Sequence, residues 1–263
     1  IDVDPEGPVF ENASSLDVDE NKTAIGSVSA VDPFGSVVTY SISGTDAESI
    51  DLDTSSGLLT FKSAPDYETK TSYSVLITAV GSIANSDQEL TININNLNDN
   101  EPVLAASATF SADENQTAIA SIVATDADGD TLTYSVTGTE LTLSTSGVLS
   151  FTSAPDYEET TSYTATVSVT DGLTSKDQSI TVNVNNLNDN SPVFTSEATF
   201  SAAENQVAVG TVTGTDADGD PLTFSVSGSE LAITSAGTLS FASAPDYETK
   251  TSYTATITIS DGL

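Results

Sequence analysis

Apolar and polar residues alternate with a period of two along most of the chain. In the middle third, apolar side chains alternate with Thr, Ser and Asn in three runs: Leu132, Tyr134 and Val136; Tyr163, Ala165, Val167 and Val169; Ile180, Val182 and Val184. Alternation of this kind predicts β-strands with one buried face. No stretch shows the 3.6-residue period of an amphipathic helix, so we expect an all-β protein.

The strand pattern recurs because the chain consists of three copies of one sequence repeat. SAPDYE occurs at 63–68, 153–158 and 243–248, and NNLNDN occurs at 95–100 and 185–190, with a spacing of 90 residues in each case. TDADGD occurs at 125–130 and 215–220, and the first repeat carries four additional residues within 44–57. We therefore predict three repeats, with boundaries at 1–98, 99–188 and 189–263.

The second repeat serves as the reference for the strands. We expect seven of them, near 103–112, 117–125, 131–137, 140–144, 147–152, 161–170 and 177–186. Seven short antiparallel strands in about 90 residues are typical of an immunoglobulin-like Greek-key sandwich. The third repeat stops at Leu263, before its counterpart of 177–186. It is therefore expected to lack its last strand and to belong to a longer array, and a strand supplied by another molecule is the less favoured alternative.

Charge narrows what such an array can bind. The 263 residues include 39 acidic and 5 basic side chains, which gives a net charge of −34. Nucleic-acid binding is excluded because it requires Lys and Arg to neutralise phosphates, and anionic membranes are disfavoured for the same reason. The chain has no His and no Cys, which excludes His-based catalytic triads and sulfur-ligated metals. No apolar run is long enough to cross a membrane.

The acidic residues gather where the predicted strands end. In a sandwich, the segments after the first, fifth and last strands share one end, and the turns after the second and sixth strands share the other. Stacking the repeats end to end therefore assembles one acidic set at each of the two junctions between repeats. The first set is Glu20, Asp66, Glu68, Asn98, Asp99, Asp126, Asp128 and Asp171, and the second is Glu114, Asp156, Glu158, Asn188, Asp189, Asp216, Asp218 and Asp261.

Such sets require cations. Two like charges about 4 Å apart repel by about 4 kcal/mol at an effective dielectric constant near 20. Carboxylate, amide and backbone carbonyl oxygens are the ligands that Ca²⁺ takes at six- to eightfold coordination, whereas Mg²⁺ dehydrates reluctantly. We therefore predict calcium sites at the two junctions. An EF-hand is excluded because its loop has Gly at the sixth position, whereas Gly129 and Gly219 stand at the fourth.

The motifs, in this order and spacing, resemble the calcium motifs of cadherin extracellular repeats, and the resemblance covers essentially the whole chain. The Ser/Thr-rich composition with DADGD and SAPDYE is similar to bacterial cadherin-like surface proteins. The resemblance implies about three calcium ions at each junction. It places Glu20, Asp66, Glu68 and Asp99 on two ions and Asn98, Asp126 and Asp171 on the third, with Asp128 as the bridge. It adds the backbone carbonyls of Leu97, Asn100, Leu187 and Asn190, and Asp130 and Asp220 as further ligands.

The first repeat departs from this pattern at its N-terminal side. Phe34 stands where the second repeat has Asp128, and Val80 is expected where it has Asp171. The leading segment 1–8 also replaces NLNDNEP, so this end is predicted to bind no calcium. The third repeat keeps Glu204, Asp246 and Glu248, which fit a further repeat. The chain has no Trp, so the tryptophan strand swap of animal cadherins is not expected.

These features predict a calcium-rigidified extracellular array for cell-surface adhesion, cell–cell contact or matrix and filament building. Besides calcium, identical arrays or a surface polysaccharide are the partners to be considered. An enzyme is not expected, because a glycosidase-like pair such as Asp66 and Glu68 would recur in every repeat. A carbohydrate-binding module and a passive spacer remain as alternatives. Tyr67, Tyr157 and Tyr247 are expected to pack at the sandwich corners rather than to stack on glycans.

Overall fold

The computed structural model describes residues 6–105 and 107–263. It forms two compact units. One consists of the described part of Ile1–Leu104 with Ala124–Thr133 and Val169–Lys176, and the other of Ala105–Val123, Tyr134–Ser168 and Asp177–Leu263. The first unit thus joins repeat one to one end of repeat two. Within the described residues the only helix is a short 3-10 turn, η1 (Ala47–Ser49), and no helix there has the length and apolar character to cross a membrane.

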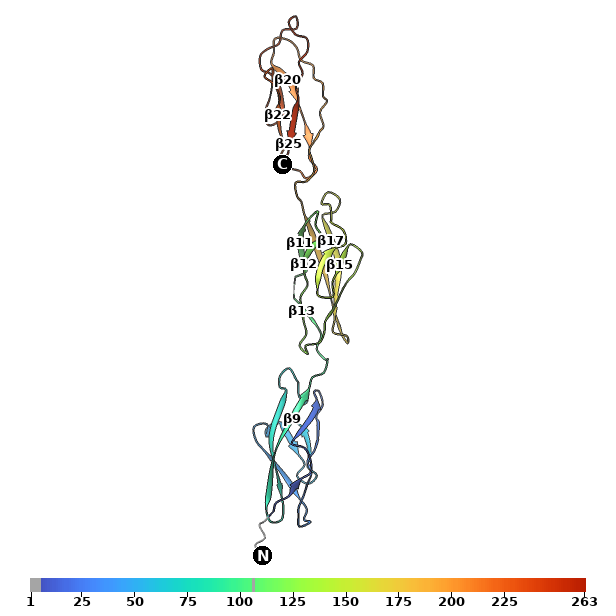
Figure 1. Ribbon diagram of the computed structural model, residues 1–263, viewed down its shortest axis with the longest axis vertical. Helices are drawn as coiled ribbons and strands as arrows, with labels where there is room; N and C mark the ends of the chain where they lie inside the picture. The colour runs from blue at the N-terminus through green and yellow to red at the C-terminus, as the bar shows by residue number, and fades with distance from the viewer. Residues whose placement is uncertain (1–5, 106) are drawn as a thin grey trace. The chain divides into compact units, whose positions relative to one another are not determined.

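The first repeat is a sandwich of two sheets (Figure 1). The four-stranded sheet runs in the order β2 (Ser15–Asp19), β9 (Asn85–Asn95), β8 (Ser72–Val80) and β5 (Thr39–Ser43). The three-stranded sheet runs in the order β3 (Ala24–Ser27), β7 (Leu58–Phe61) and β6 (Ile50–Leu52). A short ladder pairs β1 (Val9–Phe10) with β4 (Ala30–Val31). The predicted sandwich is therefore confirmed.

The period-two pattern explains the core between the sheets. Leu59, Ile77, Leu90 and Ile92 are almost completely buried, and each lies on the inward face of its strand. Burying one such side chain contributes about 1.5–3 kcal/mol to folding. Tyr67 packs against this core, as expected for a corner residue, and Tyr157 is half-buried. Tyr247 is exposed in the third repeat.

The second repeat follows the predicted strand order, but its first two strands are each divided. The first becomes β10 (Val103–Leu104) and β11 (Thr109–Asp113), and the second becomes β12 (Ala118–Ser121) and β13 (Ala124–Thr125). The other strands are β14 (Thr133–Val136), β15 (Leu141–Leu143), β16 (Val148–Phe151), β17 (Ser162–Thr170) and β18 (Ser175–Asn185). The division arises because β10 pairs with β13, whereas β11 pairs with β18 in the other sheet.

The expectation that all strands are antiparallel was wrong. β2 runs parallel to β9, and β11 runs parallel to β18. The first strand changes sheets midway and then lies beside the last strand in the same direction. This pairing matters for function because it sets Asp19 opposite Asn95. The residue after β2 therefore lies beside the segment that leaves β9 for the next repeat.

The third repeat lacks its last strand, as predicted. Its strands are β19 (Val193–Phe194), β20 (Ala208–Thr211), β21 (Gly214–Thr215), β22 (Thr223–Val226), β23 (Leu231–Ile233), β24 (Thr238–Phe241) and β25 (Ile257–Ser260). Segment 199–203, the counterpart of β11, forms no strand, and the described residues include no counterpart of β18, the parallel partner of β11. A cavity of about 770 Å³ opens between the sheets, lined by Phe200, Leu239, Phe241 and other residues.

Strand register corrects one sequence assignment. Thr39 pairs with Val80 in the first repeat just as Thr223 pairs with Ser260 in the third. Val80 is therefore the counterpart of Ser260, and Gly81 is the counterpart of Asp261 and Asp171. The position still carries no carboxylate. The first five residues of the leading segment lie outside the described residues.

Asp32 closes this end of the first repeat with hydrogen bonds. Its carboxylate is 4 % exposed and accepts the backbone N–H groups of Phe34 (2.7 Å) and Ser82 (3.0 Å). The two donors tie the turn after β4 to the turn after β8. Hydrogen bonds from Ser82 and then Phe34 hold the pKa of Asp32 below its usual value. This end is thus held together by the protein's own donors.

Replacing Asp32 with Ala is expected to lower the melting temperature at neutral pH, equally in chelator and in calcium. A carboxylate with a depressed pKa stabilises the fold above its unfolded-state pKa, and this stabilisation is lost as pH falls through the folded-state pKa. The difference between the variant and the parent should therefore shrink in acid. Thermal melts across pH measure it, and a difference that does not change with pH would contradict this account.

Candidate metal centres

Two groups of four carboxylates form where the repeats meet the linkers. In the first, Glu20 follows β2, Glu68 follows β7, Asp99 follows β9, and Asp128 lies between β13 and β14. Each offers one carboxylate oxygen, and the four oxygens lie within 4.8 Å of one another. The second group has the same geometry, with Glu114, Glu158, Asp189 and Asp218. Each group lies within one of the two compact units.

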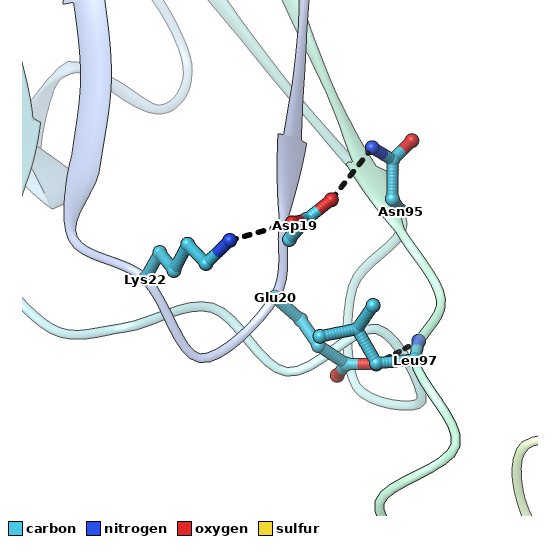
Figure 2. A network of polar contacts seen from close by, with 5 residues as sticks. All are labelled: Asp19, Glu20, Lys22, Asn95 and Leu97. Carbon is cyan, nitrogen blue, oxygen red and sulfur yellow. Dashed lines mark hydrogen bonds and ion pairs between the residues drawn. The ribbon is translucent and has the colours of Figure 1, made fainter.

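Glu20 is the innermost member of the first group. Its side chain is 1 % exposed, and it accepts the backbone N–H groups of Tyr67 (2.7 Å) and Leu97 (2.8 Å). Figure 2 shows Glu20 at the end of β2 bonded to Leu97, next to the contact between Asp19 and Asn95. Glu114, 2 % exposed, makes the same two bonds to Tyr157 and Leu187. A buried charge needs a compensating partner beyond two neutral donors.

Asp128 binds the linker through the backbone. One of its oxygens accepts the N–H groups of Asp99 (2.9 Å) and Asn100 (2.8 Å). Burial raises the pKa of Asp128, but the hydrogen bonds from Asn100 and Asp99 outweigh it, so the net shift is downward. The carboxylate of Asp128 therefore stays ionised although three other carboxylates lie beside it. Asp218 binds Asp189 and Asn190 in the same way.

Three carboxylates converge on one amide nitrogen. Nδ2 of Asn100 lies 3.3 Å from Glu68, 3.0 Å from Asp99 and 2.7 Å from Asp128. An amide has two N–H protons, so it cannot serve three ionised acceptors fully, and it carries no charge to offset theirs. Burial and then the negative charge of Glu20 raise the pKa of Glu68. Asn190 takes the same position among Glu158, Asp189 and Asp218.

A second set of oxygens lies on the side of the following repeat. Asp126, Asp128 and Asp130 offer oxygens within 4.8 Å of one another, as do Asp216, Asp218 and Asp220. Burial, followed by the charges of Asp126 and Asp128, raises the pKa of Asp130. Asn98 donates to the carbonyl of Asp171 at 3.3 Å, and Asn188 donates to that of Asp261 at 3.4 Å.

Four buried oxygens at these positions have no hydrogen-bond partner among the described residues. They are Oδ1 of Asn98, Oδ2 of Asp126, Oδ1 of Asn188 and Oδ2 of Asp216. A buried unpaired acceptor costs about 1–3 kcal/mol, so such groups call for a ligand. All the atoms that could bind a metal at these positions are hard oxygens, which fits Ca²⁺. The residues present therefore fit the ion that the sequence predicts.

Other predicted ligands lie nearby but are engaged elsewhere. Asp66 accepts the N–H of Glu68 (3.1 Å) and the hydroxyl of Thr69 (2.8 Å), and Asp156 accepts the N–H of Glu158 (2.9 Å). The Asp171 carboxylate accepts N–H groups of Leu173 (2.7 Å) and Thr174 (2.6 Å), and that of Asp261 accepts Leu263 N–H (3.0 Å). Leu97 and Leu187 contribute N–H bonds to Glu20 and Glu114.

Sequence reasoning missed the second Asn of each NNLNDN linker motif. Asn96 donates to the backbone carbonyl of Asp128, and Asn186 donates to that of Asp218, both at 2.7 Å. Asn96 alternates with Asn98 and Asn100 along an extended segment, so period-two spacing was the available signal. In the third repeat, Glu204, Asp246 and Glu248 also approach one another, but all three are exposed.

Known proteins with similar repeats were found by sequence and by fold. A family model described as bacterial Ig domain matches residues 98–185 and 188–263. Protocadherin Fat 4 of Mus musculus is 32 % identical over 296 aligned residues, which span 99 % of this chain and 6 % of Fat 4. Protocadherin Fat 1 of Homo sapiens is 29 % identical, over 71 % of this chain and 5 % of Fat 1. The chain thus spans a small part of these relatives.

Solved structures share the fold. The human CDH23 EC21-23 structure superposes with a TM-score of 0.70 at 21 % identity, covering 92 % of each chain. The human Desmocollin-1 ectodomain superposes with a TM-score of 0.68 at 19 % identity, covering 94 % of this chain and 55 % of the other. Likeness at this identity establishes the architecture of the repeats.

Proposed function

This chain is an array of cadherin-type extracellular repeats whose second and third members belong to the bacterial Ig domain family, and on that premise we propose that it binds calcium at its two junctions. Bound calcium stiffens the array, which serves in cell-surface adhesion, cell–cell contact or matrix building. The repeats span 1–98, 99–188 and 189–263 in this proposal.

One observation carries the proposal: three carboxylates meet at a single uncharged amide, Asn100, and again at Asn190. The unpaired buried oxygens of Asn98 and Asp126 support it independently. About three ions per junction would provide positive charge for these acceptors. Either feature alone would fit a hydrogen-bonded acidic turn, but their joint recurrence at both junctions favours a cation.

Each residue has a distinct part in holding calcium. Glu20, Glu68 and Asp99 present carboxylates from repeat one and its linker. Asp66 would join them by giving up its hydrogen bonds with Glu68 and Thr69. Asn98 and Asp126 offer their free oxygens, with Asp130 and Asp171 beside them. Asp128 belongs to both groups and joins them. The carbonyls of Leu97 and Asn100 complete the first junction. The second junction uses Glu114, Asp156, Glu158, Leu187, Asn188, Asp189, Asn190, Asp216, Asp218, Asp220 and Asp261.

When bound, calcium supplies two positive charges and a coordination shell that fixes ligands from both repeats at once. Extracellular modules bind it at about 10⁻⁴–10⁻³ M. At free calcium about 100 times the dissociation constant, one site stabilises the folded state by about 2.7 kcal/mol. Several sites therefore change stability by an amount comparable with that of a whole domain, about 5–15 kcal/mol.

The test compares the purified chain in chelator and in millimolar calcium, using thermal melts and small-angle scattering on the same samples. We expect a higher melting temperature and a stiffer, longer particle in calcium. Mg²⁺ at the same concentration serves as the control and should produce a smaller effect. Beads coated with the chain should aggregate in calcium if copies bind one another. Melting and scattering that do not respond to calcium would refute the proposal.

A further inference from the structure

Three turns of the molecule share a rare backbone conformation. Asn21, Asn115 and Asn205 have φ of 63°, 61° and 59°, and they are the non-glycine residues with positive φ among those described. Each directly follows a glutamate (Glu20, Glu114 or Glu204), and each donates its backbone N–H to a proline carbonyl, at 3.0, 3.0 and 2.9 Å. Asn tolerates the left-handed region better than other side chains. The positive φ alone is therefore enough to explain why an Asn or a Gly stands at these three positions.

The side chains of Asn21 and Asn115 make hydrogen bonds that the left-handed backbone conformation does not require. Nδ2 of Asn21 donates to Oδ2 of Asp99, and Nδ2 of Asn115 donates to Oδ2 of Asp189. Asp99 and Asp189 are the linker members of the two carboxylate groups. Both side chains are exposed, so little else restrains them. The turn after the first strand thus holds the linker carboxylate by one of its oxygens.

The second oxygen of each aspartate then faces the group. Oδ1 of Asp99 lies 3.0 Å from the Asn100 amide, and Oδ1 of Asp189 lies 2.9 Å from the Asn190 amide. These are the nitrogens on which three carboxylates converge. Without the bond to Asn21, an exposed aspartate would rotate away from Glu20, Glu68 and Asp128, because like charges repel. The amide holds it in place without adding a charge of its own.

We infer that Asn21 and Asn115 are positioning residues that preset the linker carboxylates for junction calcium. They are not ligands, and the inference rests on the proposed function above. Groups that orient a metal ligand typically change metal affinity by about 10–100-fold when they are removed. Asn205 has the same turn, but the 263 residues contain no third NDN segment to supply an aspartate. The chain therefore contains its own control.

The experiment replaces Asn with Gly, which keeps the left-handed turn and removes only the amide. Calcium binding is measured by calorimetry for the parent, for the double variant N21G/N115G, and for N205G. We expect the double variant to bind about 10-fold more weakly or worse and N205G to match the parent. Melts in chelator should show similar, small losses per Gly substitution. Equal affinity in all three proteins, or equal loss in N205G, would overturn the inference.

A measurement on the parent alone covers the case in which the double variant fails to fold. In the metal-free protein, the side-chain amide protons of Asn21 and Asn115 should exchange with solvent more slowly than those of Asn205, by nuclear magnetic resonance. Equal exchange at all three would also overturn the inference. A parent that binds no calcium while these amides are protected would instead refute the proposed function and leave the hydrogen bonds in place.

Discussion

Replacing Asp128 with Ala is expected to abolish calcium binding at the first junction and to leave the second intact. Its carboxylate belongs to both oxygen groups and also accepts the N–H groups of Asp99 and Asn100. Its loss removes a shared ligand and the anchor of the linker together. The number of ions bound per chain should fall to about half, because six- to eightfold coordination cannot be completed. Calorimetric titration measures the stoichiometry.

The symmetric variant is the matched control. Asp218→Ala should remove the second junction's ions and spare the first, and the double variant should bind none tightly. In scattering, each single variant should regain about half of the flexibility that chelator causes. A single variant that loses all calcium, or none, would show that the two junctions are not the independent sites proposed here.

Replacing Glu20 with Ala is expected to destabilise the first repeat by roughly 2–4 kcal/mol, even in chelator. The buried carboxylate accepts the backbone N–H groups of Tyr67 and Leu97, and both donors would lose their partner. Each buried donor left unsatisfied costs about 1–3 kcal/mol, and relaxation recovers part of the sum. Urea unfolding of the metal-free chain measures the loss.

Glu204→Ala provides the comparison in the third repeat. Glu204 is exposed and accepts one N–H, that of Tyr247, at 3.0 Å. The same substitution there should cost less than about 1 kcal/mol. If Glu20→Ala and Glu204→Ala cost the same in chelator, Glu20 acts only through bound calcium or long-range charge, and its structural role is refuted.

Most of the fold was predictable because local rules and tertiary structure agree. Runs such as Tyr163 to Val169 alternate cleanly. Their inward members are buried (Val167 and Val169) or half-buried (Tyr163 and Ala165), as the alternation predicts. The division of the first strand was not predictable from alternation. The sequence alternates in the same way before and after the break, around Val103 and around Thr109. The two halves of the strand differ only in their partners: β10 pairs with β13, whereas β11 pairs with β18.

The carboxylates of the candidate site and the amide of Asn98 were also predictable, but the amides of Asn21 and Asn96 were not. Recurrence at a fixed spacing singled out Glu20, Asp99 and Asp128, because repeated carboxylates at strand ends have few structural reasons to exist. Asn21 and Asn96 were overlooked because Asn is common in turns, so its presence there carries little information. Their importance comes from which oxygen each amide reaches. For Asn21, this depends on the parallel pairing that brings the end of β2 beside the end of β9.

Crystals grown in millimolar calcium and measured for anomalous scattering would locate the junction ions themselves. We expect anomalous peaks at each junction, among the oxygens of Glu20, Glu68, Asp99 and Asp128 and beside Asn98 and Asp126, with matching peaks one repeat further along. Ordered junctions without such peaks, and with the Asn100 amide still among three carboxylates, would contradict the proposed calcium sites.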